Sequence, residues 1–340
     1  MRMYSLDVLK LVMAYAIAFF HVGTHVAPGP TAAVQVFFVI SGFFLGKKFY
    51  EKQAEDYSAW RYTLDHVRGL YPNYLFAEVA LFGYLTARAV YYLLRSPSWA
   101  GVGELLKSFY SQIPDLLLVQ SAYTSYPSIN YPLWQLSALL IAGYFVFAML
   151  RWNEKLSRRL LFPAAILMLE SLLNTGVALD GNYGPIFMPL FRAFGPLCLG
   201  VLAWYFTTTQ EYKTLLSHRL LMNLAGIVGL VGIFAYETYY NIFLIATVAV
   251  IWNCYWADSW INRLFNHRIF RHFGKLSYAI YLNQALVERF VCARLFPKQA
   301  LGVKGNVVFF AILTGYSIFT LVLVDKGMAR LRRRKQAKAE

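Results

Sequence analysis

Long apolar runs separated by short polar connections dominate the pattern along the chain. Runs of this length suit helices that cross a membrane, because about 20 helical residues span a hydrocarbon core about 30 Å thick. The pattern therefore predicts an all-α, polytopic membrane helix bundle with about ten transmembrane helices. The expected spans are 5–26, 32–46, 69–94, 132–150, 159–177, 187–207, 219–236, 239–256, 273–293 and 305–324. We expect one domain over residues 1–330, a basic tail over 331–340 and no extra soluble domain.

The composition agrees with this interpretation and excludes a soluble domain. Of 340 residues, 59% are hydrophobic and only 14% are charged. The net charge of +15 indicates topology rather than nucleic-acid binding, because the basic residues lie between apolar spans and in the tail. By the positive-inside rule, both termini are predicted to be cytoplasmic and the segment 95–131 to lie outside. The first span lacks a small-residue cleavage site, so we expect it to remain as a helix.

The first span carries polar groups at helical spacing. Lys10 and His21 are eleven residues apart, which is about three turns, so both project from one face roughly 16 Å apart. His25 lies one turn beyond His21 on that face, and Asp7 can pair with Lys10. Ionisable groups inside a membrane helix are costly and indicate function. The alternative is structural, with Lys10 anchored at the membrane surface and His21 hydrogen-bonded within the bundle.

The beginning of the chain resembles a known family. The run Leu6-Asp7, Lys10, ten residues and His21, followed by FFVISGF at 37–43, is similar to the opening of the membrane acyltransferase-3 family. The signature of that family is Arg-x10-His on the first helix. Lys10 stands where arginine is usual, which keeps the cation but loses the planar fork suited to bidentate phosphate contact.

The next loop extends the resemblance. Lys47, Lys48 and Arg68 precede a Tyr-Pro step that ends at Pro72, and the family typically has an arginine-rich stretch leading into Tyr-Pro at its third helix. We expect these cations to form a mouth for the phosphates of coenzyme A, with Pro72 in the first turn of the span. Ordinary positive-inside charge is the alternative interpretation.

Two later elements match the family with departures. Trp134 begins a Trp-x-Leu-Ser element, but Leu139 occupies a position where many members have an acidic residue. The run FGKLSYAIYLNQ contains Tyr278 and resembles the closing motif Gly-x-x-Ser-Tyr-x-x-Tyr-Leu-x-His, with Asn283-Gln284 in place of its usual ending. The matches run in the expected order from residue 6 to about residue 284.

The resemblance implies transfer of an acyl group, most often acetyl, from cytoplasmic acyl-coenzyme A to a hydroxyl of a cell-envelope polysaccharide or glycolipid. The protein would lie in the bacterial cytoplasmic membrane and need no metal or nucleic acid. His21 is the candidate base or acyl carrier, because imidazole has an ordinary pKa near about 6.5, and His25 is a second candidate. The residues expected to bind the cofactor are Lys10, Lys47, Lys48 and Arg68, and those expected to line the substrate channel are Ser41, Trp134, Arg192 and Tyr278.

Three of the four channel residues have a structural alternative. Trp134 suits the aromatic belt at a membrane interface, Tyr278 suits helix packing, and Arg192 suits a buried pair with Glu170. Two other classes of protein remain open as well. A transporter or flippase would need polar groups at membrane depth, and a non-catalytic membrane sensor would agree with the departure at Leu139.

Overall fold

A computed structural model describes residues 3–24, 29–96, 99–122, 128–174, 182–183, 186–235, 240–296 and 301–336. The described chain is almost entirely helical, so the predicted all-α membrane bundle is confirmed. One two-residue ladder, β1 (Asn182–Tyr183) with β2 (Ile186–Phe187), is antiparallel. The helices are α1 (Tyr4–His21), α2 (Pro30–Glu51), α3 (Ala59–Arg95), α4 (Trp99–Leu116), η1 (Gln120–Ala122), η2 (Tyr131–Leu133), α5 (Trp134–Trp152), α6 (Glu154–Leu156), η3 (Ser157–Leu161), α7 (Phe162–Asn174), α8 (Met188–Phe206), α9 (Gln210–Ser217), α10 (Arg219–Ala235), α11 (Tyr240–Tyr255), α12 (Trp260–Phe265), η4 (Arg268–Phe270), α13 (Phe273–Phe290), η5 (Val291–Leu295) and α14 (Val303–Gln336).

The predicted number of ten spans is wrong. In the described part of the chain, five helices are long and apolar enough to cross a membrane, or six if α9 and α10, which meet at 95°, form one broken span. Each of the ten predicted segments does contain a helix, but several are too short or too polar. For example, α7 has 13 residues and α11 has 16, fewer than the roughly 20 that a bilayer needs. The five helices that qualify are α1, α2, α5, α8 and α14.

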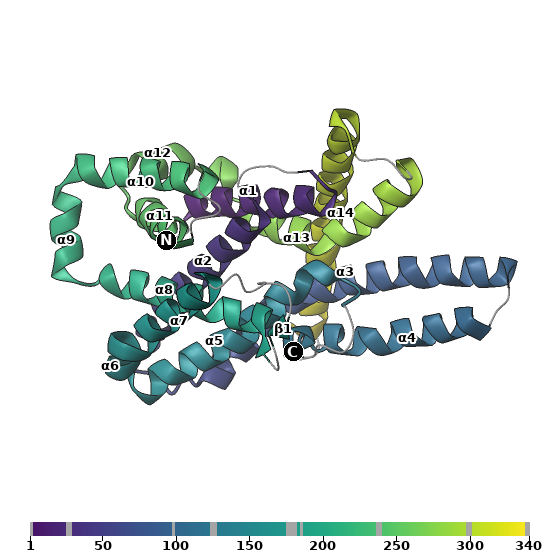
Figure 1. Ribbon diagram of the computed structural model, residues 1–340, viewed down its shortest axis with the longest axis horizontal. Coiled ribbons are helices and arrows are strands. Elements are labelled where there is room, and N and C mark those ends of the chain that lie inside the picture. Colours follow the sequence, from purple (N-terminus) through teal and green to yellow (C-terminus); the bar gives the residue numbers. More distant parts are fainter. Residues whose placement is uncertain are drawn as a thin grey trace.

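The third helix begins earlier than predicted, which corrects the interpretation of Pro72. The Ser58 side chain caps the start of α3 by accepting a hydrogen bond from the Arg61 N–H, so Pro72 lies inside the helix and not in its first turn. The loop expected after this span is partly helical, because α4 folds back along α3. Together they form a long hairpin that projects from the bundle (Figure 1).

The centre of the bundle is formed by α1, α2, α8 and α13. The closest crossing joins α2 to α8, where a Cβ on Gly42 would lie 2.1 Å from the Leu197 carbonyl oxygen and one on Gly200 would lie 2.2 Å from that of Val39. Small residues allow membrane helices to approach each other this closely. Ser41, the neighbour of Gly42, is half-buried near this crossing.

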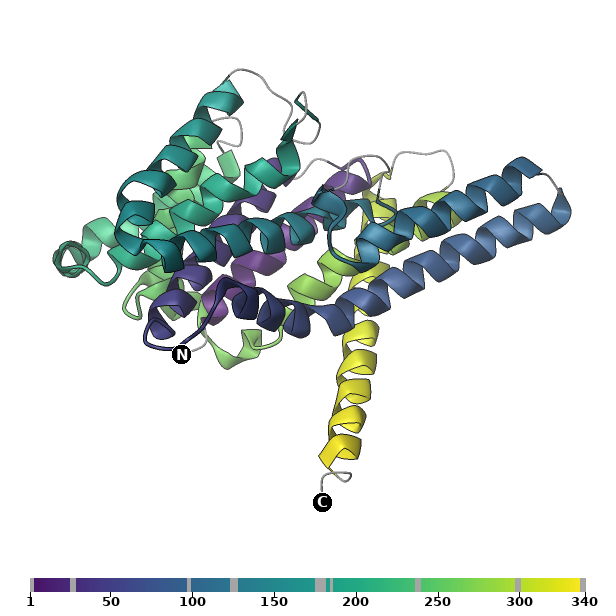
Figure 2. The ribbon, with the colours of Figure 1, turned by 90° about the horizontal axis from the view of Figure 1, so that it is seen from below.

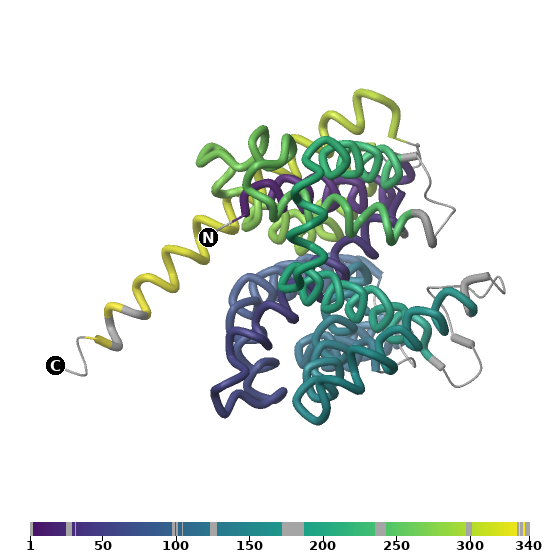
Figure 3. The backbone as a smooth tube through the Cα atoms, turned by 90° about the vertical axis from the view of Figure 1, so that its left-hand side faces the viewer, coloured from purple at the N-terminus to yellow at the C-terminus, as the bar shows by residue number. Residues whose placement is uncertain are grey.

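The chain forms two groups of helices joined by α9. Figure 3 shows α1 with α10–α14 in the upper group and α3–α8 in the lower group. In Figure 2, α14 extends well beyond the body of the bundle toward the C-terminus. The cavities described next lie where α1 and α13 meet α2 and α3.

Candidate active site

An inner cavity of about 240 Å³ lies among α1, α2, α3, α5 and α13. It contains three of the residues expected in the site, namely Lys10, Ser41 and Tyr278. The remaining walls are mostly apolar. They are formed by Phe37, His66, Leu70, Gln135, Leu136, Leu139, Gly274, Ser277 and Tyr281.

Two larger cavities adjoin the inner one at the start of α3. The first, of about 590 Å³, is lined by Lys47 and Lys48, and the second, of about 420 Å³, by Lys10 and Arg68. All three share Leu70, so they meet at one turn of α3. The four cations predicted to bind the cofactor are therefore brought together around adjoining cavities.

Lys10 lies between the inner cavity and one of the outer ones. Its Nζ is 3.6 Å from Asp7 Oδ1 and 5.2 Å from the centre of the Phe44 ring. The Asp7 carboxylate packs against the backbone of α13, since a Cβ on Gly274 would lie 2.3 Å from Asp7 Oδ1. The glycine that begins the closing motif thus makes room for the ion pair that positions Lys10.

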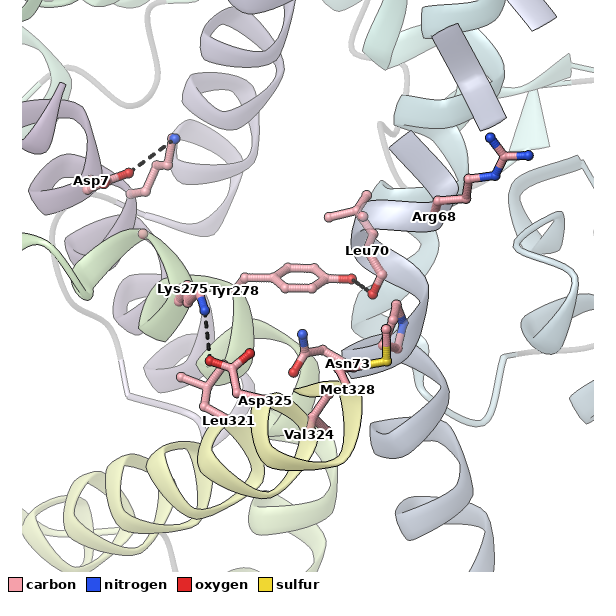
Figure 4. Close-up of a pocket in the computed structure, with 14 residues that line it drawn as sticks. Asp7, Arg68, Leu70, Asn73, Lys275, Tyr278, Leu321, Val324, Asp325 and Met328 are labelled. Carbon is pink, nitrogen blue, oxygen red and sulfur yellow. Dashed lines mark hydrogen bonds and ion pairs between the residues drawn. The ribbon is translucent and has the colours of Figure 1, made fainter. Parts of the chain in front are cut away.

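Tyr278 crosses the outer cavity of Lys10 and Arg68. Its hydroxyl donates to the Leu70 carbonyl oxygen at 3.1 Å, which joins α13 to α3 (Figure 4). Lys275 Nζ, a further cation in this cavity, is 2.7 Å from Asp325 Oδ2 on α14. The Arg68 guanidinium points away from Tyr278 and lies 3.6 Å from Asp65 Oδ1.

The other outer cavity is flanked by aromatic rings. Lys47 Nζ lies 5.7 Å from the Trp204 ring centre, and Lys48 Nζ lies 5.4 Å from that of Tyr57. The Tyr57 hydroxyl donates to Asp65 Oδ2 at 2.7 Å. Burial and then this hydrogen bond raise the pKa of Tyr57 to about 12, so its hydroxyl keeps its proton at neutral pH. The same bond lowers the pKa of Asp65, which stays ionised beside the cations.

His21 is the last residue of α1 and lies apart from the inner cavity. Its ring packs edge-to-face on Tyr131 with centroids 4.8 Å apart, and the Tyr131 hydroxyl donates to Glu288 Oε2. The hydroxyl of Tyr281, a cavity residue, donates to the carbonyl of Pro132. Tyr281 and the turn at 131–132 therefore lie between the cavity and His21. His25 lies outside the described residues.

A family model described as an acyltransferase domain matches residues 3–326, nearly the whole chain. This chain belongs to the acyltransferase-3 family. The resemblance carried by Lys10, His21 and the later motifs is confirmed by this match. No curated protein and no solved structure matches the chain.

The acyltransferase places Trp134 and Arg192 together but outside the inner cavity. The Arg192 guanidinium lies 5.5 Å from the Trp134 ring centre, and its side chain is buried. Among the described residues, no hydrogen-bond donor reaches the buried Oε1 of Glu170, the suggested partner of Arg192. The roles of Trp134 and Arg192 in substrate binding stay predictions.

Leu139 and Asn283, the two departures from the family motifs, lie in different surroundings in the structure. Leu139 faces the inner cavity, so an apolar side chain lies where many members have a carboxyl group. Asn283 points to the opposite side of α13, where its amide donates to Thr320 Oγ1 at 2.9 Å. The departure at Leu139 is therefore the one that changes the cavity.

His66 is a cavity residue that the sequence did not single out. It lines both the inner cavity and the one at Lys47, and its ring lies 4.5 Å from that of Tyr62. Its position one helical turn before Leu70 could have indicated that His66 shares a face with the cavity residues. The hydropathy pattern starts the third span at residue 69, and a histidine in a loop before that residue has no defined face. Within the described residues, no group of three or more His, Cys, Asp or Glu side chains is arranged to hold a metal ion.

Proposed function

We propose that this protein moves an acyl group, most simply acetyl, from acyl-coenzyme A to a hydroxyl of a cell-envelope carbohydrate. Membership of the acyltransferase-3 family supports acyl transfer. One observation carries the rest of the proposal. The four candidate cations line cavities that adjoin at one end of α1, and His21 lies at the other end of that helix.

The donor would bind at the cationic end. Lys47, Lys48 and Arg68 would contact its phosphates, because clustered cations in partly dry cavities favour polyphosphate. Lys10 would bind a phosphate at the entrance to the inner cavity, whose apolar walls suit an uncharged arm and an acyl chain. The path from Lys10 to His21 follows α1 over roughly 16 Å.

The chemistry needs a base near the acceptor hydroxyl. A neutral His21 would take the hydroxyl proton while the oxygen attacks the thioester carbonyl, so a C–O bond forms as the C–S bond breaks. The leaving thiolate of coenzyme A then takes up a proton. In the covalent version, His21 attacks first and carries the acyl group to the hydroxyl in a second step.

The protein would lie in the bacterial cytoplasmic membrane with its cationic cavities facing the cytoplasm, where acyl-coenzyme A is available. The excess of Lys and Arg at this end supports that orientation. The acceptor would approach His21 from the opposite side.

The test is acyl transfer by His21→Ala, His25→Ala and His218→Ala at matched membrane abundance. His218 is exposed between α9 and α10 and serves as the matched control. General-base catalysis contributes about 10²- to 10⁴-fold, so His21→Ala should have no detectable activity while His218→Ala resembles wild type. His25→Ala should retain activity with weakened acceptor affinity. Robust turnover by His21→Ala would contradict the proposed mechanism.

A further inference from the structure

A group of buried polar side chains lies between α3, α4 and the turn before α5, outside the cavities described above. We call Glu78, Gln112, Asp115, Gln120 and Asn130 the buried carboxyl cluster. Their exposed fractions are 1%, 4%, 1%, 6% and 1% respectively. Gln112, one turn before Asp115 on α4, bonds to Glu78, and Tyr74, one turn before Glu78 on α3, bonds to the Asp115 backbone. The two carboxyl groups therefore lie on facing turns of α3 and α4.

The hydrogen bonds within the cluster connect its members to one another and to the surrounding backbone. The Gln112 amide donates to Glu78 Oε2 at 2.6 Å, and the Ile129 N–H donates to Asp115 Oδ2 at 3.0 Å. The Gln120 amide donates to the Tyr74 hydroxyl at 3.3 Å, and that hydroxyl donates to the Asp115 carbonyl oxygen at 2.5 Å. The Gln112 amide thus binds a carboxyl group of the cluster, whereas the Gln120 amide also donates to the Leu133 carbonyl oxygen at 3.2 Å.

The cluster has more acceptors than donors. The Ser128 hydroxyl and the Asn130 N–H lie beside the Asp115 carboxyl group. Among the described residues, five buried side-chain oxygens of the cluster, one from each member, still have no donor at ordinary hydrogen-bond geometry. They are Glu78 Oε1, Gln112 Oε1, Asp115 Oδ1, Gln120 Oε1 and Asn130 Oδ1. Burying an unsatisfied acceptor costs free energy, and burying two neighbouring carboxylates costs far more unless positive charge is present.

In the described part of the chain, no basic side chain forms an ion pair with either carboxyl group, that of Glu78 or that of Asp115. The titratable side chains that interact with Glu78 are Asp115 on α4, Tyr74 on α3 itself and Tyr278 on α13. None of them is basic, and the Arg289 guanidinium on α13 donates to the Ile129 carbonyl oxygen at 2.8 Å, which is a backbone atom of the same turn.

We propose that the buried carboxyl cluster binds one positive charge from solution between Glu78 and Asp115, either a proton or a sodium-sized cation. A shared proton would let one carboxyl group donate to the other, and a small cation would be coordinated by the unpaired oxygens, since carboxylate and amide oxygens are its usual ligands. This proposal rests on the buried oxygens and is independent of the proposed function.

The position of the cluster gives its occupant a structural role. The Asp115 carboxyl group accepts a hydrogen bond from the Ile129 N–H, and the Asn130 amide donates to the Leu282 carbonyl oxygen on α13 at 3.4 Å. The next residue, Tyr131, packs against His21. Loss of the bound charge would leave two repelling carboxylates behind this turn and would loosen the contact to His21.

The test measures the melting temperature of the purified full-length protein in detergent from pH 5 to pH 9, in sodium chloride and in choline chloride at equal ionic strength. The variants are Glu78→Gln and Asp115→Asn, which keep the shape of the neutral acids but cannot ionise. Glu170→Gln, which removes a carboxyl group on α7 away from the cluster, is the matched control.

If the charge is a proton, the folded state keeps a proton that the unfolded chain releases, so the wild-type melting temperature falls as pH rises in both salts. If it is a cation, sodium should raise the wild-type melting temperature at high pH by about 2–5 °C over choline. Glu78→Gln and Asp115→Asn should each flatten the dependence that wild type and Glu170→Gln show.

The proposal is overturned if Glu78→Gln and wild type respond identically to pH and to sodium. If the variants do not accumulate, the melting temperatures of the wild-type protein alone test the proposal. A melting temperature that is the same in both salts and does not fall between pH 5 and pH 9 would equally overturn the proposal.

Discussion

Two side chains on α1 show what residue spacing can and cannot predict. The spacing of Lys10 and His21 predicted one shared helix, and both do lie on α1. Tyr131 and Glu288 were not foreseen beside His21, because that contact joins residues far apart in the chain and has no local pattern. Spacing therefore identified the polar groups on one helix but not the partners that other helices bring to them.

Lys10 provides the first prediction at the residue scale. Lys10→Ala should raise the apparent requirement for acyl-coenzyme A about ten- to hundredfold with little change in acceptor use, because a charge-assisted phosphate contact contributes about 1.5–3 kcal/mol. Lys10→Arg should be tolerated, since arginine keeps the charge. The measurement is the KM for each substrate. Equal losses in both variants would instead indicate that the Asp7 ion pair is structural.

Tyr131 provides the second prediction at the residue scale. Tyr131→Leu removes the ring that packs on His21, whereas Tyr131→Phe removes only the hydrogen bond to Glu288. An edge-to-face pair contributes about 0.5–1.5 kcal/mol, so Tyr131→Leu should lower kcat about two- to tenfold below Tyr131→Phe. Initial rates at saturating substrates measure this. If the two variants are equally slow, the hydrogen bond and not the ring positions His21.

At the scale of elements, apolar runs predicted where helices form but not which of them are long enough to span a membrane. All ten predicted segments contain helix, yet α7 and α11 are too short, and α3 extends beyond its predicted start to Ala59. Helix ends depend on local caps such as Ser58 and on tertiary packing, which hydropathy does not report.

The crossing of α2 and α8 gives a prediction for these elements. Gly42→Ala would place a Cβ 2.1 Å from a backbone carbonyl oxygen, and such overpacking typically costs about 1–3 kcal/mol or more. Gly83→Ala on α3 is the matched control, because nothing lies within 4 Å of its added Cβ. Thermal unfolding in detergent should show a clear loss for Gly42→Ala and none for Gly83→Ala. Equal melting temperatures would mean that the helices can separate without penalty.

At the scale of the whole molecule, the charge distribution predicts the orientation in the membrane. Reporter fusions after residue 340 and near residue 125 should report opposite sides, with the first in the cytoplasm, because Lys and Arg concentrate in alternate connections. Alkaline phosphatase and green fluorescent protein fusions measure this directly. Fusions that report the same side would mean that an even number of spans separates residue 125 from the C-terminus, and would contradict this orientation.

The aromatic side chains between the inner cavity and His21 bear on how permeable the membrane is to protons. The rings of Phe37 and Tyr281 pack against each other at the wall of the cavity, and the Tyr281 hydroxyl donates to the Pro132 carbonyl oxygen. A continuous aqueous passage from the outer cavities to the opposite side of the membrane would let protons cross and would dissipate the transmembrane proton gradient. If the donor and the acceptor arrive from opposite sides, as proposed, these aromatic side chains would keep the membrane electrically sealed between turnovers.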